Sequence, residues 1–333
     1  ADTPLELSGL SGAVDFTEQS ISARPVRARL WGQPVQIGIA TRNAGTDQDS
    51  FTRIEAESTT PLAELARQAP SGLWQYLGGQ FGWQLAVDLP NRDLNRESVT
   101  LGYRLTSDLK GVAIDLPAPL GKSPRQDRKL DLSGTLTPGR AMTLNGLVGD
   151  LGLTLALQPG QSKDRSPLTG GHIRLGTSSA PPATEHHGLL VDGTLKTLDV
   201  QPWLARFGSD GTQSARRDKT RGSTALAHLP RIEGQLSIGR LELGDLHLSK
   251  TTLGLQQHSD GSTIRIRANE LAGDIRLPSS NAAPLAIQLE RLDLGAVARQ
   301  LTPAGQPAPV KGSGERVQRV PSLDLRVEDL RWG

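Results

Sequence analysis

The stretch VQIGI at residues 35–39 decides the fold, because its apolar side chains alternate with polar or small ones. Successive side chains of a β-strand point to opposite faces, so a period of two predicts a strand that is apolar on one side only. Leucine-rich segments of the same kind recur along the chain, as in LGYRL at 101–105 and LGLTLAL at 151–157. The sequence therefore predicts one apolar face shared by many strands.

Short alternating segments separated by Gly, Pro, Asn and Asp predict a mostly β protein with roughly eighteen strands and a few short helices. The strand-turn-strand unit recurs as in an array that grows by adding hairpins. We therefore expect a long, curled antiparallel sheet that forms an open, repeating groove. Helices are expected near 61–78, 202–207 and 294–301, and separate strands at 231–238, 240–248 and 251–258.

Composition divides the chain into three parts. Residues 1–158 are interpreted as a first groove segment that contains the helix near 61–78. Residues 159–227 are rich in Gly, Ser, Pro and Thr and predict a loop-rich segment, with a strand pair running into the short helix near 202–207. Residues 228–333 are interpreted as a second groove segment, in which a Pro- and Gly-rich linker at 302–319 precedes a last strand at 321–328.

Aliphatic side chains supply nearly all of the apolar area, because only 3% of the 333 residues are aromatic while 36% are hydrophobic. Closed β-sandwiches usually fill their cores with large aromatic side chains, so this composition suits a smooth lining better. A formal net charge of +2 provides no global field to recruit nucleic acid, and no nucleic-acid partner is expected. The absence of cysteine excludes disulfides and thiolate chemistry.

The apolar positions of the alternating segments are the candidate lipid-contacting residues, because they share the apolar face. The set consists of Val35, Ile37, Ile39, Leu85, Val87, Leu101, Tyr103, Leu105, Ile114, Leu116, Leu153, Leu155, Leu157, Leu236, Ile238, Ile264, Ile266, Leu285, Ile287, Leu289, Leu323, Leu325 and Val327.

No residue pattern predicts an enzyme, a cofactor or a metal site. The adjacent pair His186 and His187 lacks the spacing that places two imidazoles on one helical face. Ser107 and Asp108 are better explained as a turn than as part of a hydrolase, because no nucleophile elbow surrounds a serine. The basic run at 216–221 lies in a Gly/Ser/Thr-rich stretch and is interpreted as a solvated loop rather than a nucleic-acid or headgroup site.

The segment SDLKGVAIDLPAPLGK at 107–122 is the densest local signal. Its apolar positions continue the alternation until Pro117 and Pro119, which cannot donate ladder hydrogen bonds. Two interpretations stay open: a strand that ends at a sheet edge, or the rim of a groove where Lys122 meets a phosphate.

This segment resembles a signature of AsmA-like proteins of the YhdP type, from Gram-negative bacteria. Similar stretches follow in order: WGQPV at 31–35, GLLVDGTLKTLDVQPWL at 188–204, LPRIEGQLSIGRLELGDLHL at 229–248 and VPSLDLRVEDLRWG at 320–333. The resemblance implies a repeating β-groove, anchored in the inner membrane and spanning the periplasm, that conducts phospholipid toward the outer membrane. It also implies that the membrane helix and the C-terminal region lie outside this chain, and that components of the two membranes are partners of the whole protein.

The apolar face supports that role on physical grounds. Exposure of acyl chains to water costs about 0.8 kcal/mol per methylene, so a two-chain lipid faces a barrier on the order of 25 kcal/mol. A continuous aliphatic trough removes most of this barrier and needs no reacting residue. The alternative is a structural or adhesive β-array in which the same alternation is buried in a closed core and no lipid is transported.

Overall fold

A computed structural model describes residues 7–43, 50–68, 72–91, 99–137, 142–158, 168–183, 188–207, 231–278, 284–301 and 323–332. The basic run at 216–221, the pair His186 and His187, and the linker at 302–319 lie outside these ranges. The chain divides into two compact units, which are described separately: unit 1 comprises 1–189 and 210–230, and unit 2 comprises 190–209 and 231–333. The predicted middle segment, 159–227, is thus divided between the two units.

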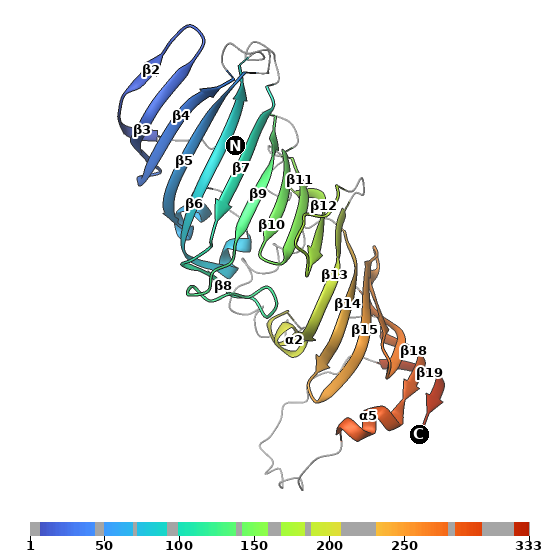
Figure 1. Ribbon diagram of the computed structural model, residues 1–333. Helices are drawn as coiled ribbons and strands as arrows, with labels where there is room; N and C mark the ends of the chain where they lie inside the picture. The colour runs from blue at the N-terminus through green and yellow to red at the C-terminus, as the bar shows by residue number, and fades with distance from the viewer. Residues whose placement is uncertain are drawn as a thin grey trace. The chain divides into compact units, whose positions relative to one another are not determined.

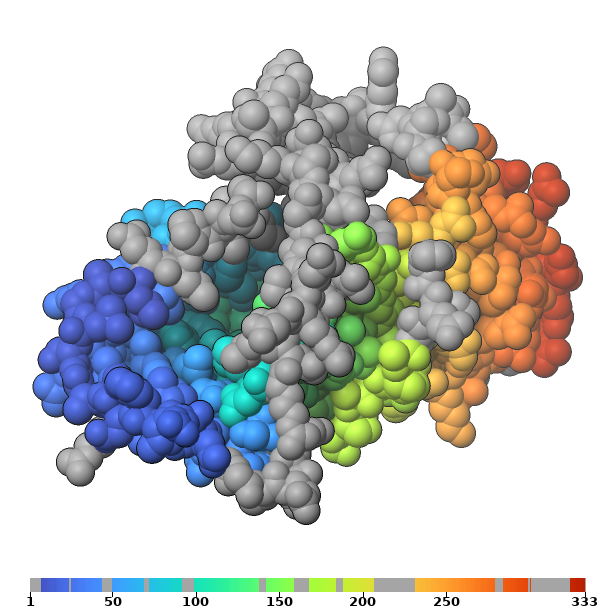
Figure 2. Space-filling model, turned by 90° about the horizontal axis from the view of Figure 1, so that it is seen from above, coloured from blue at the N-terminus to red at the C-terminus, as the bar shows by residue number. Residues whose placement is uncertain are grey.

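Unit 1 is an antiparallel sheet whose strands follow one another in a single layer (Figure 1). Figure 2 shows the unit from above, with the N-terminal strands in blue. Along the sheet the order is β2, β3, β4, β5, β6, β7, β9, β10, β11, β12, and β1 pairs with the other end of β3. The strands are β1 (Leu7–Ser11), β2 (Val14–Phe16), β3 (Ile21–Leu30), β4 (Gln33–Arg42), β5 (Phe51–Pro61), β6 (Leu77–Pro90), β7 (Leu101–Ser107), β8 (Val112–Ile114), β9 (Leu130–Leu136), β10 (Met142–Val148), β11 (Leu151–Leu157) and β12 (Leu168–Leu175).

Unit 2 carries the later strands of the sheet, which are antiparallel except at the last one. Strand β13 (Gly188–Asp199) leads into helix α2 (Gln201–Phe207), and the sheet continues through β14 (Ile232–Leu243), β15 (Leu246–Gln257), β16 (Gly261–Arg267), β17 (Leu271–Pro278) and β18 (Leu285–Asp293). Helix α5 (Leu294–Leu301) follows, and β19 (Leu323–Arg331) then pairs with β18 in parallel. The carboxylate of Asp199 accepts a hydrogen bond from the Gln201 amide at 2.9 Å and so caps α2.

The chain leaves the unit 1 sheet between β7 and β9 to form an insert, residues 108–129. Its only strand, β8, pairs with the first residues of β6 instead of with the neighbouring β7. The insert, helix α1 (Leu62–Gln68) and the 3-10 helix η1 (Gly72–Tyr76) build the buried cluster of unit 1, in which Leu62, Leu109 and Val112 are 6%, 6% and 3% exposed. These elements come from opposite sides of β6 in the sequence, so tertiary packing alone brings them together.

The buried cluster of unit 2 forms around the β14–β15 hairpin, where Ile238, Leu241 and Leu248 are 2%, 1% and 0% exposed. Ile238 and Leu241 are three residues apart, so the apolar alternation changes phase between them. Opposite this point, Lys250 adopts a left-handed conformation with φ of 49°. This local irregularity lets both strands direct side chains into one cluster without a change in pairing register.

The predicted class, a mostly β protein built on open antiparallel sheet with few short helices, is confirmed. Several boundaries were wrong. Two strands, not three, cover 232–257, because the chain turns at Gly244, with φ of 65°, and runs straight through Gly239. A single strand, β13, replaces the pair expected before α2, and the helix expected at 61–78 ends at Gln68, followed by η1. The helix expected at 294–301 is confirmed as α5.

Candidate functional site: the apolar strips

Register places the apolar side chains of unit 1 in rows that run across the strands. Side chains of directly paired residues lie on the same face of a sheet, so a chain of pairs defines each row. The first row crosses nine strands without a polar side chain and is therefore about 38 Å long at the usual strand spacing. Its members are Val26, Ile37, Ala56, Leu85, Leu105, Leu132, Gly146, Leu153 and Ile173.

A second row runs beside the first on the same face. Its members are Ile39, Ile54, Val87, Tyr103, Gly134, Leu144, Leu155 and Gly171. We call these two rows the unit 1 strip. Beyond the second row, between β4 and β6, the strip meets polar side chains: the hydroxyls of Thr41 and Thr52 are 3.3 Å apart, and Thr52 donates to Asn91 at 2.9 Å.

Unit 2 repeats the arrangement over six strands. One row contains Leu236, Leu253, Ile266, Gly273, Leu289 and Val327, and the next contains Gly234, Leu255, Ile264, Ile275, Ile287 and Leu325. We call these two rows the unit 2 strip. It is about 24 Å long at the usual strand spacing. Past the second row it meets the polar pair Gln257 and Ser262.

Most of the candidate residues therefore lie on the two apolar faces. Fifteen belong to the strips: Ile37, Ile39, Leu85, Val87, Tyr103, Leu105, Leu153, Leu155, Leu236, Ile264, Ile266, Ile287, Leu289, and Leu325 and Val327 on the edge strand. Val35, Leu101, Leu157, Ile238 and Leu285 lie on the same strands, on the same faces, beside the strips, and the backbone of Leu323 pairs with that of Leu285.

The structure does not place Ile114 and Leu116 in the sheet. Ile114 packs against the buried cluster of the insert, and Leu116 follows the end of β8. Alternation alone could not show this, because the insert carries the same period of two as the sheet that it leaves.

The strips are half-buried rather than sealed. Among the candidate residues whose side chains are described, only Val35 and Ile238 are buried, at 3% and 2% exposed, while Leu325 and Val327 are exposed. The others lie between these limits. A closed sandwich core would bury such side chains almost completely, so partial exposure favours a face that is open to a further apolar molecule.

Tyr103 is the one polar group within the unit 1 strip. Its hydroxyl donates to the Thr143 carbonyl at 2.6 Å, and a side chain at the intervening Gly134 would come within 2.8 Å of that hydroxyl. The ring therefore lies across a glycine, where it covers backbone that has no side chain of its own. Burial raises the pKa of Tyr103 above its usual value, so the phenol stays neutral. The hydrogen bond satisfies the hydroxyl, and the strip keeps an apolar surface here.

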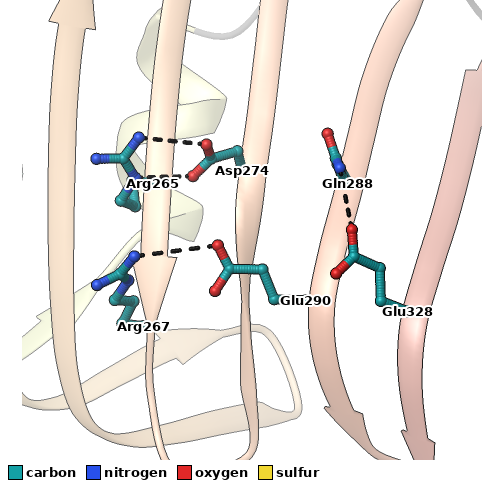
Figure 3. A network of polar contacts seen from close by, with 6 residues as sticks. All are labelled: Arg265, Arg267, Asp274, Gln288, Glu290 and Glu328. Carbon is teal, nitrogen blue, oxygen red and sulfur yellow. Dashed lines mark hydrogen bonds and ion pairs between the residues drawn. The ribbon is translucent and has the colours of Figure 1, made fainter.

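The opposite face of the strands is polar and charged in both units. Arg104 and Asp131 form a two-bonded ion pair in unit 1, with N–O distances of 2.8 and 2.6 Å. In unit 2, Arg265 pairs with Asp274 at 3.0 Å, and the pairs Arg267–Glu290 and Gln288–Glu328 continue across the next strands (Figure 3). These side chains alternate with strip residues along each strand, so the two faces have opposite chemistry.

A hollow of about 940 Å³ lies on the polar side of unit 1. Its lining includes a row of polar residues that pair in order across β3 to β6, as well as Lys129 and Asp131. The row consists of Arg27, Gln36, Glu57 and Gln84. An acyl chain bound beside these charged side chains would displace water from them, and this loss of hydration costs free energy. The strip, and not this hollow, is the candidate surface for an apolar ligand.

Lys122 does not meet the groove rim, and the interpretation as a phosphate-binding residue was wrong. Its side chain is 6% exposed, and its ammonium donates to the carbonyls of Leu109, Val112 and Ser123 at 2.7, 2.8 and 3.0 Å. Burial lowers the pKa of this ammonium. The three carbonyls use its donors, so Lys122 holds the insert together.

Other site types find no support in the part of the chain that the structure describes. There, no three His, Asp or Glu side chains gather in a way that could hold a metal ion. None of the helices in the described ranges combines the length and the apolar character needed to cross a membrane.

The fold and the site together define a class: a mostly β protein whose open sheet carries half-buried aliphatic strips across its strands. The chain belongs to the YhdP family, since the family profile described as "YhdP protein" matches residues 1–333. It is 21% identical over 295 residues to the protein named "Intermembrane phospholipid transporter YhdP" of Escherichia coli (strain K12). This alignment covers 84% of the chain but 20% of the relative, so the chain spans about a fifth of that protein's length. No solved structure matches the chain.

Proposed function

We propose that this chain is a segment of a bridge-like lipid transfer protein that conducts phospholipids across the periplasm, from the inner to the outer membrane, through an apolar groove. The observation that carries the proposal is the first row of unit 1, which offers nine consecutive strands with no polar side chain. The name of the Escherichia coli relative, an intermembrane phospholipid transporter, supports the same substrate.

The geometry suits movement better than fixed binding. A row of aliphatic side chains presents similar surface at each step of about 4.8 Å from strand to strand. Acyl methylenes gain about 0.8 kcal/mol each when they leave water, and this gain is nearly the same at every position of the row. A lipid therefore meets no deep pocket in which it would stall, and its headgroup keeps its hydration outside the strip.

The proposed acyl-chain contacts are the strip residues, and components of the two membranes are the proposed partners of the whole protein. The structural alternative, an extended β-array without lipid, predicts sealed side chains on these faces. The partial exposure of Ile37, Leu155 and Ile266 argues against it.

Lipid extraction and mass spectrometry of the purified full chain test the proposal. We expect phospholipid to co-purify with the native protein, and Ile37→Asp or Leu155→Asp to reduce the amount bound and block transfer between vesicles. Gln36→Asp is the matched control, because Gln36 is exposed on the polar face next to Ile37. Absence of phospholipid from the native protein, or equal loss in Gln36→Asp, would overturn the proposal.

A further inference from the structure

The two sides of the unit 1 strip differ. On one side of the first row runs a third row on the same apolar face, which includes Val35, Ser58, Leu130, Val148 and Leu151. Beyond the second row, Thr41 on β4, Thr52 on β5 and Asn91 after β6 hydrogen-bond to one another, while the same row continues with Leu101, Leu136, Met142 and Leu157 on β7 to β11. At β4 to β6, a lipid on the strip therefore meets a polar boundary on this side.

The buried cluster of unit 1 lies over the third row. Phe81, Leu130 and Val148 come from the apolar face of the sheet and pack against Leu62, Leu109 and Val112. Leu62 belongs to α1, and the other two belong to the insert. Apolar surface that these six side chains bury against one another is no longer available to an acyl chain.

Backbone hydrogen bonds fix the insert to the strand beneath it. The amide of Gln80 donates to the Gly111 carbonyl at 3.2 Å, and the amide of Asp115 donates to the Tyr76 carbonyl at 2.8 Å. β8 adds pairing with Leu77–Gly79. The insert is thus joined to the start of β6 by a short ladder as well as by apolar contact.

Two cations, the buried Lys122 and the partly buried Arg128, hold the insert in its folded form. Lys122 joins three carbonyls from both halves of the insert. Arg128 donates to the carbonyls of Leu120 and Gly121 at 2.8 and 2.9 Å. Ammonium and guanidinium groups that replace water with carbonyl acceptors make strong, directional contacts, so the loop keeps one shape.

We infer that the insert and α1 form a fixed wall along one side of the unit 1 strip, so that a phospholipid bound at β4 to β6 lies with its acyl chains on the two rows and its headgroup toward Thr41, Thr52 and Asn91. This inference rests on the proposed function and adds the side on which the headgroup lies. The wall side carries the apolar cluster, whereas at β4 to β6 the opposite side offers hydroxyl and amide groups that a hydrated phosphate ester tolerates.

Photoactivatable phospholipids test the inference on the unmodified full chain. Phosphatidylethanolamine with a diazirine near the end of an acyl chain is expected to label the strip, at Leu153 and Leu155, and to leave Leu130 and Val148 unlabelled. The same lipid with the diazirine on its headgroup is expected to label the Thr52 and Asn91 side. Mass spectrometry of the peptides identifies the residues that each probe has labelled.

The outcomes separate the two proposals. Acyl labelling of Leu130 and Val148 as strong as that of Leu155, or headgroup labelling on the wall side, overturns the wall while it leaves lipid conduction intact. Labelling of no strip residue by either probe overturns the proposed function itself.

Lys122→Met gives a second test, because it removes the ammonium that joins the insert. We expect acyl labelling to appear at Leu130 and Val148 in this variant and to stay at background in Lys110→Met, the matched control, whose lysine is exposed in the same insert. If the two variants give the same labelling pattern, Lys122 does not hold the wall closed. If Lys122→Met does not fold, the probes on the unmodified chain still decide the inference.

Discussion

Unit 1 and unit 2 carry the same two-row apolar strip but close its flank in different ways. Unit 1 uses an insert of 22 residues, 108–129, together with α1, and holds it with the buried Lys122. Unit 2 uses its own hairpin, where the alternation changes phase and directs Ile238, Leu241 and Leu248 into one cluster. The strip is therefore the shared feature, while the elements that build the flanking cluster differ between the two units.

The largest expected effect is a loss of unfolding free energy in the buried cluster of unit 2. Leu248→Ala removes a side chain that is 0% exposed and should cost about 2–5 kcal/mol of unfolding free energy, as large-to-small changes in cores do. Leu277→Ala is the control, because Leu277 is 39% exposed and should cost less than about 1 kcal/mol. Chemical denaturation measures both. A cost for Leu248→Ala no greater than that of the control would show that the hairpin cluster is not a core.

The second effect tests whether unit 1 depends on its buried lysine. Lys122→Met leaves three carbonyls without their donor and should cost about 2 kcal/mol, since hydrogen bonds to charged groups contribute roughly 1.5–3 kcal/mol each and the loss of a desolvated charge offsets part of this. Lys110→Met should leave the denaturation midpoint almost unchanged. Equal midpoints for the two variants would mean that the apolar cluster alone holds the insert.

A smaller effect is expected at the strip itself. Tyr103→Phe keeps the ring over Gly134 but removes the donor to the Thr143 carbonyl, and should cost about 1 kcal/mol. Because the ring stays, the amount of co-purified phospholipid should not fall. A loss of lipid without a loss of stability would show that the hydroxyl contacts the ligand instead of the backbone.

The smallest effect concerns the polar face. The hydrogen bonds from Arg104 lower the pKa of Asp131 below its usual value, so this pair stabilises the folded state above the ordinary Asp pKa, and the contribution is lost as the pH falls through the lowered value. Both side chains are largely exposed, so salt weakens the effect. Denaturation of the Arg104→Gln variant from neutral to acid pH should show slightly less acid sensitivity than that of the native chain. A steeper acid dependence in the variant would contradict this sign.

Sequence periodicity predicted the strip residues well and their surroundings poorly. Ile37, Leu155 and Ile266 lie on the apolar faces because a period of two is a local property of any strand. Ile114 has the same local pattern, yet it packs in the insert, because the pairing partner of β8 is the start of β6. The strands expected at 231–238 and 240–248 are one strand, β14, and the chain turns at Gly244 instead.

The sequence by itself determined that this protein is a mostly β chain with one aliphatic face per strand, since side-chain direction along a strand follows from backbone geometry. Only the tertiary structure decided which residues align into rows across the strands and that Lys122 is buried. Register, the insert and the parallel pairing of β19 depend on contacts between residues far apart in the chain, and no local pattern encodes the partner of a strand.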